Sequence, residues 1–298
     1  MGFLSLLAAL VLEQVRPLSR HSRVDDAFGR FRDLALARCR GDGFGSRGAW
    51  LLAVLGSGVA VLVVHDLLYS LWTPLAFAFD AALLYFLIGF RRQEESFADV
   101  ERALANDDIE GAARRLSAWS GVDRSGAGAG ELARLTVEHA VLGAHHGIFG
   151  VIFWFVLMPG PMGAVMYRVA CDLAQSPEAS PFVRRAFGWL DWFPAHMTAL
   201  ACSVIGNFEE AIASWRTQAP LWPERSAGVV LAAAGGALGL RLGMPAHENG
   251  VVVDRPELGQ GSAVDVENMP RAARLIWRVL VLLVLVLALL AVAGRVGG

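Results

Sequence analysis

One stretch of this chain constrains its fold more than any other. Twenty uncharged residues lie between Gly147 and Arg168, and Pro159-Gly160-Pro161 interrupts them in the middle. An apolar run of about twenty residues is long enough to cross a bilayer. The prolines argue against one straight helix, because proline removes a backbone donor and clashes with the preceding turn. The stretch therefore predicts two half-helices joined at a break, either as an intramembrane site or simply as a tight helical hairpin.

The rest of the sequence is also too apolar for an ordinary soluble domain. Of its 298 residues, 55% are hydrophobic and only 18% are charged. A helical hairpin is predicted over Ala49–Phe90 with a short turn at Ser70–Thr73, and Ile276–Ala293 is a further apolar helix. We predict an all-α fold: a polytopic membrane protein with a broken central helical hairpin and amphipathic cytoplasmic helices. One membrane-embedded domain is expected over residues 1–298.

Arginines indicate which ends of these segments face the cytoplasm. They lie before the first hairpin and directly after it, and basic residues favour the cytoplasmic side. Residues 91–146 are therefore predicted to form a cytoplasmic helical segment, in which a helix cap precedes Glu110. An amphipathic helix is expected within Leu18–Gly48, and residues 244–270 are expected to form an extramembrane loop.

Small residues recur at spacings of four within Ala227–Gly243. This spacing puts them on one helix face, where they let two helix backbones approach closely. The face is compatible with a seam inside the chain and equally with the interface of a homodimer.

Charge and cysteine content exclude several classes of protein. The formal net charge is −2, and no basic patch interleaved with aromatic residues indicates a nucleic-acid partner. The three cysteines are isolated, without a CxxC pair or the spacing of a zinc site, so we expect free thiols and no metal centre. His139, His145 and His146 lack the ligand set of a metal site and are expected to be structural or interfacial.

Four polar side chains are predicted to lie at membrane depth or at its edge: Glu13, Asp66, Asp80 and His146. Ionisable residues inside membrane segments are functional candidates, because a charge is costly there unless it has a partner or a use. The alternative is that these side chains face a packed polar seam or the interface.

Several short blocks, taken together, resemble a known family. They are Gly147–Arg168, Phe187–Leu200, Gly235–Gly243 and Val252–Gly261. In this order they resemble the CobD/CbiB family, which comprises integral-membrane adenosylcobinamide-phosphate synthases of the cobalamin pathway. The start of the chain, an apolar stretch that ends in Leu12-Glu13-Gln14, looks more like AmpE. AmpE is a related protein of the bacterial inner membrane that is linked to the regulation of β-lactamase induction.

The chain departs from the pattern of the synthases where catalysis would need acidic groups. Their motif Glu-Asn-x-x-Asp-Gly is matched here by Leu142–Gly147, which keeps only the final glycine. ATP-dependent amide formation needs carboxylates to hold Mg²⁺ and groups that position phosphates. The resemblance therefore implies a regulatory or sensory protein of AmpE type in the bacterial inner membrane, with neither enzymatic activity nor a cofactor.

Such a protein would bind a small anionic ligand or a membrane protein partner. The alternative is an enzyme, an adenosylcobinamide-phosphate synthase that uses ATP and Mg²⁺ to form an amide bond.

Polar residues remain at several matching positions and supply the candidate ligand-binding residues: Arg168, Asp191, Arg241, Arg255 and Glu257. The three arginines can form an anion-binding pocket, because arginine pairs bidentately with phosphate or carboxylate. The alternative is that Arg168–Asp191 and Arg241–Glu257 are structural ion pairs. Arg168→Ala is expected to impair folding or function more than Arg124→Ala.

Overall fold

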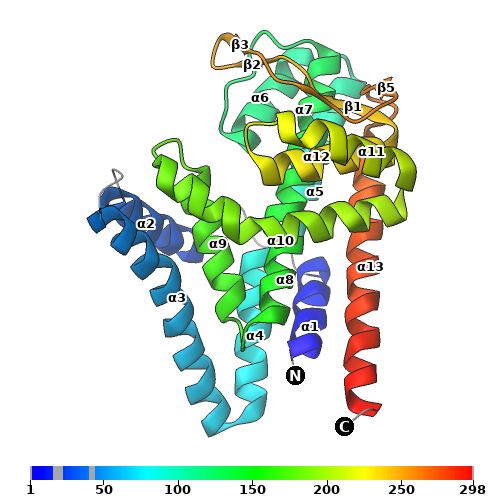
Figure 1. Cartoon of the computed structure of the whole chain (residues 1–298). Helices are drawn as coiled ribbons and strands as arrows, with labels where there is room; N and C mark the ends of the chain where they lie inside the picture. Colours follow the sequence, from blue (N-terminus) through cyan, green and yellow to red (C-terminus); the bar gives the residue numbers. More distant parts are fainter. Residues whose placement is uncertain (1, 16–22, 40–43, 297–298) are drawn as a thin grey trace. The chain divides into compact units, whose positions relative to one another are not determined.

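The computed structural model describes residues 2–15, 23–39 and 44–296 of the chain (Figure 1). Most of these residues are helical, and the strands are short. The predicted all-α fold and multi-pass membrane architecture are confirmed. The amphipathic helix expected within Leu18–Gly48 is present in part as α2 (Arg23–Arg38), while residues 16–22 and 40–43 lie outside the described residues.

The elements of the described residues follow one another along the chain. The helices are α1 (Gly2–Val15), α2 (Arg23–Arg38), α3 (Phe44–Leu71), α4 (Thr73–Ile88), α5 (Phe90–Ala105), α6 (Ile109–Ser120), α7 (Ala129–Ala144), a π-helical turn (His145–Phe149), α8 (Gly150–Leu157), α9 (Met162–Gln175), α10 (Pro181–Ile205), α11 (Phe208–Gln218), a 3-10 turn (Ala219–Leu221), α12 (Arg225–Leu238) and α13 (Met269–Val296). The strands are β1 (Leu240–Gly243), β2 (Ala246–Glu248), β3 (Val251–Val253), β4 (Glu257–Leu258) and β5 (Ser262–Ala263).

Among the described residues, four helical stretches are long and apolar enough to cross a membrane: Gly45–Leu71, Thr73–Ala105, Ala129–Leu157 and Met269–Ala293. The first two meet at Trp72, inside the turn predicted at Ser70–Thr73. The third begins earlier than expected, because α7 continues through the π-helical turn into α8. The first arm of the broken hairpin therefore begins before Gly147, within the segment 91–146. The cytoplasmic position of that segment stays a prediction.

The chain folds into two compact units. Unit 1 comprises Met1–Arg92 and His146–Phe193, and unit 2 comprises Gln93–His145 and Pro194–Gly298. Helices α5 and α10 and the π-helical turn each continue from one unit into the other. The single domain expected over residues 1–298 stays a prediction, and each unit is described by itself below.

Unit 1 contains two antiparallel helix pairs. One pair is α3 with α4 and the other is α8 with α9, and α3 also packs against α9 (Figure 1). Helix α1 packs against α4 and α8. Leu6 of α1 and Leu84 of α4 are completely buried, so these two helices contribute to the apolar core of the unit.

The predicted break in the central hairpin is confirmed as a tight turn between α8 and α9. Gly160 in this turn has a φ of +56°, a backbone conformation that favours glycine. Two other glycines let the arms approach closely. A Cβ on Gly150 would lie 2.3 Å from Cζ of Tyr167, and one on Gly163 would lie 2.2 Å from the carbonyl oxygen of Trp154.

Unit 2 is organised around α12, which is buried along most of its length. A Cβ on Gly236 would lie 2.5 Å from the carbonyl oxygen of Glu210 in α11. The small residues of α12 therefore form a seam inside the chain, which was one of the two predicted uses. The homodimer stays a prediction, without support from this face.

The Gly-rich helix ends earlier than predicted. A helix was expected over Ala227–Gly243, but α12 stops at Leu238, because Gly239 adopts a left-handed conformation with a φ of +66°. Strand β1 follows directly and lies between β4, to which it is antiparallel, and β5, to which it is parallel.

The loop expected over residues 244–270 contains more regular structure than its sequence indicated. Strands β2 and β3 form a hairpin. Asn249 and Gly250 at its turn both have positive φ, +51° and +80°, which is typical of a two-residue hairpin turn. The loop is therefore a set of short strands within unit 2.

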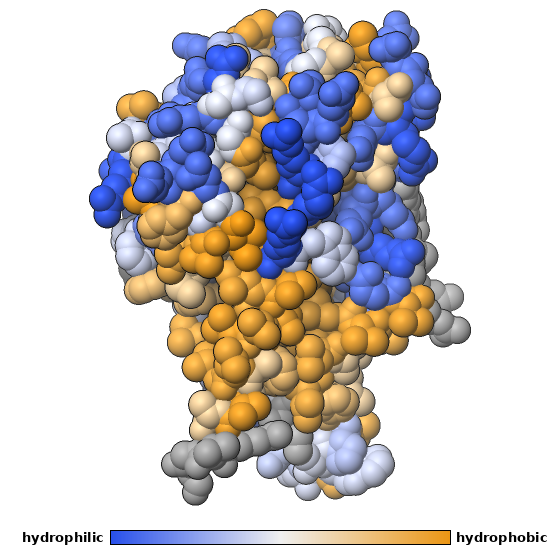
Figure 2. Space-filling view, turned by 90° about the vertical axis from the view of Figure 1, so that its right-hand side faces the viewer, coloured by the Kyte–Doolittle hydropathy of each residue, from blue (hydrophilic) through white to orange (hydrophobic). Residues whose placement is uncertain are grey.

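Helices α3 and α13 expose large apolar side chains that an aqueous surface would not favour. Leu52, Leu289 and Leu290 are 75%, 62% and 62% exposed. Figure 2 shows hydrophobic side chains over a broad region of the face in view. This is the surface expected of helices that contact lipid.

Candidate functional site

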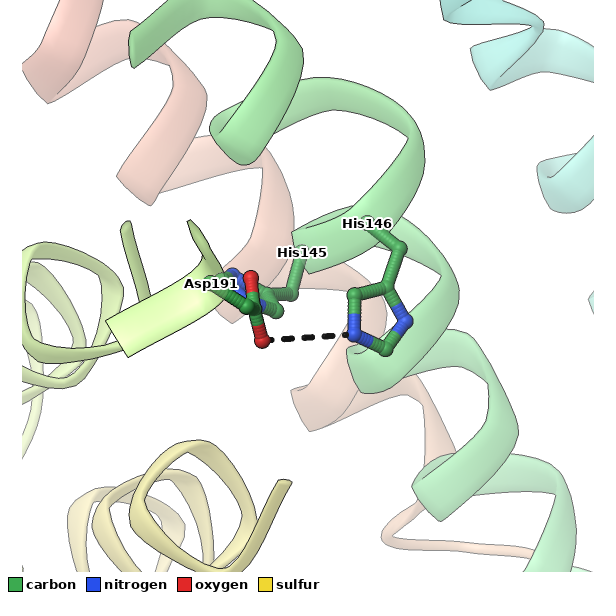
Figure 3. A group of neighbouring side chains, drawn as sticks. All are labelled: His145, His146 and Asp191. Atoms are coloured by element: carbon green, nitrogen blue, oxygen red, sulfur yellow. Dashed lines mark ion pairs between the residues drawn. The ribbon is translucent and has the colours of Figure 1, made fainter. Parts of the chain in front are cut away.

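The side chain of Asp191, on α10, is the centre of a buried polar cluster in unit 1 (Figure 3). Only 1% of it is exposed. The hydroxyl group of Tyr167, on α9, donates a hydrogen bond of 2.6 Å to Oδ1. The imidazole of His146 is turned toward the same carboxylate, with 3.6 Å between Nε2 and Oδ2. This distance is too long for a hydrogen bond but close enough for an ion pair.

The other ring nitrogen of His146 has a different neighbour. Nε2 of Gln175, at the end of α9, lies 3.1 Å from Nδ1. The ring also packs against Phe187, with 5.6 Å between the centroids. His146 thus lies between a buried carboxylate and an exposed amide.

The other two histidines of this segment have structural partners. His145, which Figure 3 draws next to His146, is completely buried, and its Nδ1 lies 2.9 Å from Oγ1 of Thr198. His139 packs edge-on against Trp119, with 4.5 Å between the ring centroids. Both agree with the predicted structural role, so His146 is the one of the three with the setting of a reactive group.

Arg168 forms an ion pair with Asp172, one turn further along α9, with 3.3 Å between Nη2 and Oδ1. Burial raises the pKa of the Asp172 carboxyl, and the Arg168 guanidinium opposes part of that rise. The predicted pair of Arg168 with Asp191 stays a prediction. The spacing of four residues between Arg168 and Asp172 was the available signal for the observed pair.

A group of charges in unit 2 surrounds Glu138 of α7. Oε1 of this buried carboxylate lies 3.1 Å from Nη1 of Arg134 and accepts a hydrogen bond of 2.8 Å from the backbone N–H of Gly243. Oε2 lies 3.3 Å from Nη2 of Arg255. A helix residue, the end of β1 and the late loop are therefore all attached to one carboxylate.

The two arginines also bind the backbone of the loop. Arg134 donates to the carbonyl oxygens of Met244 and Pro245, at 3.3 and 2.8 Å, and Nε of Arg255 donates to Met244 at 3.2 Å. Met244 has a φ of +67°, unusual for a residue with a side chain. The guanidinium groups hold this turn by three carbonyl contacts.

Further pairs hold the β2–β3 hairpin. Nη1 of Arg124 lies 3.1 Å from Oε1 of Glu248 and 3.0 Å from the carbonyl oxygen of His247. The ring of His247 lies 2.9 Å from a carboxylate oxygen of Glu131, on α7. The cluster thus pairs Arg124, Arg134 and Arg255 with glutamates, as in a structural lock. The anion pocket predicted from Arg168, Arg241 and Arg255 stays a prediction.

Arg241 and Glu257 form the predicted pair, but at 3.9 Å and with both side chains more than two fifths exposed. They lie on the neighbouring strands β1 and β4. An exposed pair at this distance contributes little to stability. Gly259, two residues further, is held more firmly, because the Gln218 side chain bonds both its N–H, at 2.6 Å, and its carbonyl oxygen, at 3.1 Å.

Among the polar residues predicted at membrane depth, Asp80 and Glu13 are buried and Asp66 is exposed. Asp80, on α4, is buried, and Oδ1 lies 2.8 Å from Nδ1 of His65 on α3. Asp66, the next residue on α3, is exposed. Glu13, at the end of α1, is buried and accepts a hydrogen bond of 2.7 Å from the backbone N–H of Arg91, at the start of α5. Glu13 therefore caps a helix, which is a structural role.

Sequence reasoning missed several residues that the structure brings together: His65, Arg134, Glu138, Tyr167 and Gln175. Arg134 and Glu138 had a signal, since opposite charges four apart on an otherwise apolar helix often pair. His65 directly precedes the candidate residue Asp66. Only the folded structure shows that the His65 side chain meets Asp80, whereas Asp66 is exposed. Tyr167 and Gln175 had no signal, because their partners come from other helices.

Comparison with known proteins gives the evolutionary relationship. The family model described as CobD/Cbib protein matches residues 13–176 and 184–276. The chain is 34% identical over 292 residues to cobalamin biosynthesis protein CobD of Stutzerimonas stutzeri, covering 92% of this chain and 93% of that protein. It is 31% identical over 247 residues to CobD of Chromobacterium violaceum, covering 78% and 79%.

A more distant relative carries the other name of the family. Cobalamin biosynthesis protein CbiB of Salmonella typhimurium is 25% identical over 269 residues, with 82% of each chain covered. No solved structure matches the chain. The predicted regulatory role is wrong, because relatives that match most of the chain are named as cobalamin biosynthesis proteins. The closeness to AmpE stays a prediction. The loss of acidic residues in one short motif had been given too much weight against similarity along the whole chain. The chain belongs to the CobD/CbiB family.

Proposed function

We propose that this chain is a membrane enzyme of cobalamin biosynthesis, an adenosylcobinamide-phosphate synthase. The reaction activates a corrinoid carboxyl group with ATP and joins it to an amine. The observation that carries the proposal is the 34% identity to a cobalamin biosynthesis protein CobD over nearly the full length of both chains.

The arrangement of unit 2 supports this proposal. The block Arg255–Gly259 was one of the features that resembled the synthases. It is held to the rest of the unit by Glu138 and by the two hydrogen bonds of Gln218. Such fixed backbone is suited to presenting a constant surface to a substrate.

The arrangement of unit 1 bears on the missing acidic motif. His146 stands where the motif carries its aspartate, and it is paired with Asp191. The position of the motif's aspartate therefore still carries a side chain that can exchange protons. The absence of the aspartate is for this reason weak evidence against catalysis.

ATP with its Mg²⁺ is the co-substrate that the proposal requires. Three acidic candidates in the described residues are already engaged: Asp80 with His65, Glu138 with Arg134 and Asp191 with Tyr167. They do not make a ready Mg²⁺ site. Mg²⁺ that arrives on the nucleotide is coordinated mainly by phosphates and water. We also propose the bacterial inner membrane as the location of this multi-pass protein.

The test is complementation of a bacterial strain that lacks its own synthase and needs it for growth. Expression of this chain is expected to restore growth, and the empty vector is not. Membranes from the complemented strain are then expected to convert the corrinoid acid to its amide only when ATP and the amine are both supplied. Failure to grow, with the chain present in the membrane at the level of a functional synthase, would refute the proposal.

A further inference from the structure

The arrangement of His146 in unit 1 is that of a proton acceptor. Its Nε2 faces the Asp191 carboxylate at 3.6 Å, and its Nδ1 lies 3.1 Å from the amide nitrogen of Gln175. An amide nitrogen donates hydrogen bonds and does not accept them. Nδ1 therefore accepts from Gln175, and the ring hydrogen is on Nε2, directed at Asp191.

The Asp191 carboxylate is fixed by a second group. Tyr167 donates to Oδ1 at 2.6 Å, which leaves Oδ2 on the side of the imidazole. Only 1% of the Asp191 side chain is exposed, against 12% for His146. The carboxylate thus supports the ring from the buried side, and the lone pair of Nδ1 is directed toward the exposed Gln175 amide.

This geometry leads to a role in the reaction proposed above. We propose that His146 is the general base that takes a proton from the amine as it attacks the activated carboxyl group. The amine nitrogen forms the C–N bond, the bond from the acyl carbon to the phosphate oxygen breaks, and the phosphate leaves with the electron pair. The proton lost from nitrogen moves to Nδ1 of His146 and makes an imidazolium.

Asp191 acts as a positioning residue in this step. A carboxylate beside Nε2 stabilises the imidazolium and keeps the ring in the orientation that exposes Nδ1. The separation of 3.6 Å is compatible with this role, because such contacts are often long in the free protein and shorten in the substrate complex. The substrate amine would take the place of Gln175 at Nδ1.

Other charged groups lie near this ring. Asp172, the ion-pair partner of Arg168 on α9, interacts electrostatically with His146, and Arg32 of α2 interacts with Asp172. Asp191 faces the ring, and Tyr167 is bonded to Asp191. Because these neighbours remain when His146 is replaced, a change in the pH profile of a His146 variant reports on position 146.

The experiment compares the wild-type chain with His146→Gln and His146→Asp in membranes, using the ATP-dependent amide-forming assay from about pH 4 to 9. His146→Gln keeps a polar side chain but cannot act as a base, and kcat is expected to fall about 100-fold or more. His146→Asp restores a base of lower pKa. It is expected to keep measurable activity, with the acidic limb of the kcat/KM profile shifted to lower pH by about 2 units.

Glu110→Gln is the control, because it alters an exposed acidic residue outside this cluster, and it is expected to keep both rate and profile. A purely structural role would leave the pH profile of His146→Asp unchanged, so an unchanged profile would overturn the inference. Wild-type activity in His146→Gln would also overturn it while the proposed function stands. If the wild-type chain itself makes no amide, the proposed function fails and this inference fails with it.

Discussion

Nη2 of Arg255 lies 3.3 Å from Oε2 of Glu138, and this contact attaches the late loop of unit 2 to the middle of helix α7. Oε1 of the same carboxylate receives Arg134 and the N–H of Gly243. Both oxygens of one buried side chain are therefore used to position the turn at Met244. A buried charge that is surrounded by partners in this way is sensitive to the loss of any of them.

The first prediction concerns this carboxylate. Glu138→Gln keeps the size of the side chain but leaves two largely buried guanidinium groups without their counter-charge. We expect it to lower the free energy of unfolding by about 3 kcal/mol. The measurement is thermal unfolding of the full chain in detergent, with protease resistance of the late loop as a second readout. Glu110→Gln, on an exposed ion pair, is the matched control, with an expected change within about 0.5 kcal/mol. Equal stability of the two variants would contradict the assigned role of Glu138.

The second prediction tests the seam between α11 and α12. A Cβ on Gly236 would lie 2.5 Å from the carbonyl oxygen of Glu210 and 2.7 Å from Cα of Ala211. Both are backbone atoms, so the helices must separate, and Gly236→Ala is expected to destabilise unit 2 by about 1–3 kcal/mol. Gly188→Ala, in α10, meets no atom within 4 Å. It is expected to be neutral or stabilising by about 1 kcal/mol, as alanine favours a helix. The idea fails if the two substitutions shift the melting temperature equally.

The third prediction distinguishes two neighbouring residues of α3. His65→Ala removes the hydrogen-bond partner of the buried Asp80, and a loss of about 1–3 kcal/mol is expected. Asp66→Ala changes an exposed residue and should matter by no more than about 0.5 kcal/mol. A double-mutant cycle of His65→Ala with Asp80→Ala is expected to give a coupling energy above about 0.5 kcal/mol. Additive effects would show that the pair does not stabilise the membrane segment.

The fourth prediction reverses an expectation from the sequence. Arg168→Ala was expected to be more harmful than Arg124→Ala. In the structure, however, the Arg124 side chain is 10% exposed and bonds both Glu248 and the His247 carbonyl oxygen, whereas that of Arg168 is 31% exposed. Arg124→Ala is now expected to destabilise the protein more, by about 1 kcal/mol. Thermal unfolding and the steady-state level in membranes, measured for both variants, show which substitution destabilises the protein more.

Much of the architecture could be predicted because it depends on local composition. The long apolar runs, the break at Pro159-Gly160-Pro161 and the cap before Glu110 were all read from short stretches, and each is present. Asp108 provides that cap, accepting a hydrogen bond of 2.8 Å from the N–H of Gly111. The end of α12 was harder, since Gly239 stops the helix by its backbone conformation, while the glycines before it stay helical and pack against other elements.

The contacts of the candidate residues could not be predicted in the same way, because their partners are distant along the chain. Asp191 was a candidate ligand-binding residue. Its observed partners, the hydroxyl of Tyr167 on α9 and the imidazole of His146 in the π-helical turn, have no local sequence signal. Arg255 was selected as an anion ligand, whereas in the fold its charge is neutralised by Glu138.

The sequence alone determined that this chain enters a membrane and bends back at residues 159–161, because hydropathy and proline act on the segment that contains them. Its kinship with the CobD/CbiB family is likewise a property of the sequence as a whole. Only the tertiary structure decided which polar groups meet. The side chains of Asp191, His146 and Tyr167 come together because of how their helices pack, and packing depends on the shapes of all the elements at once.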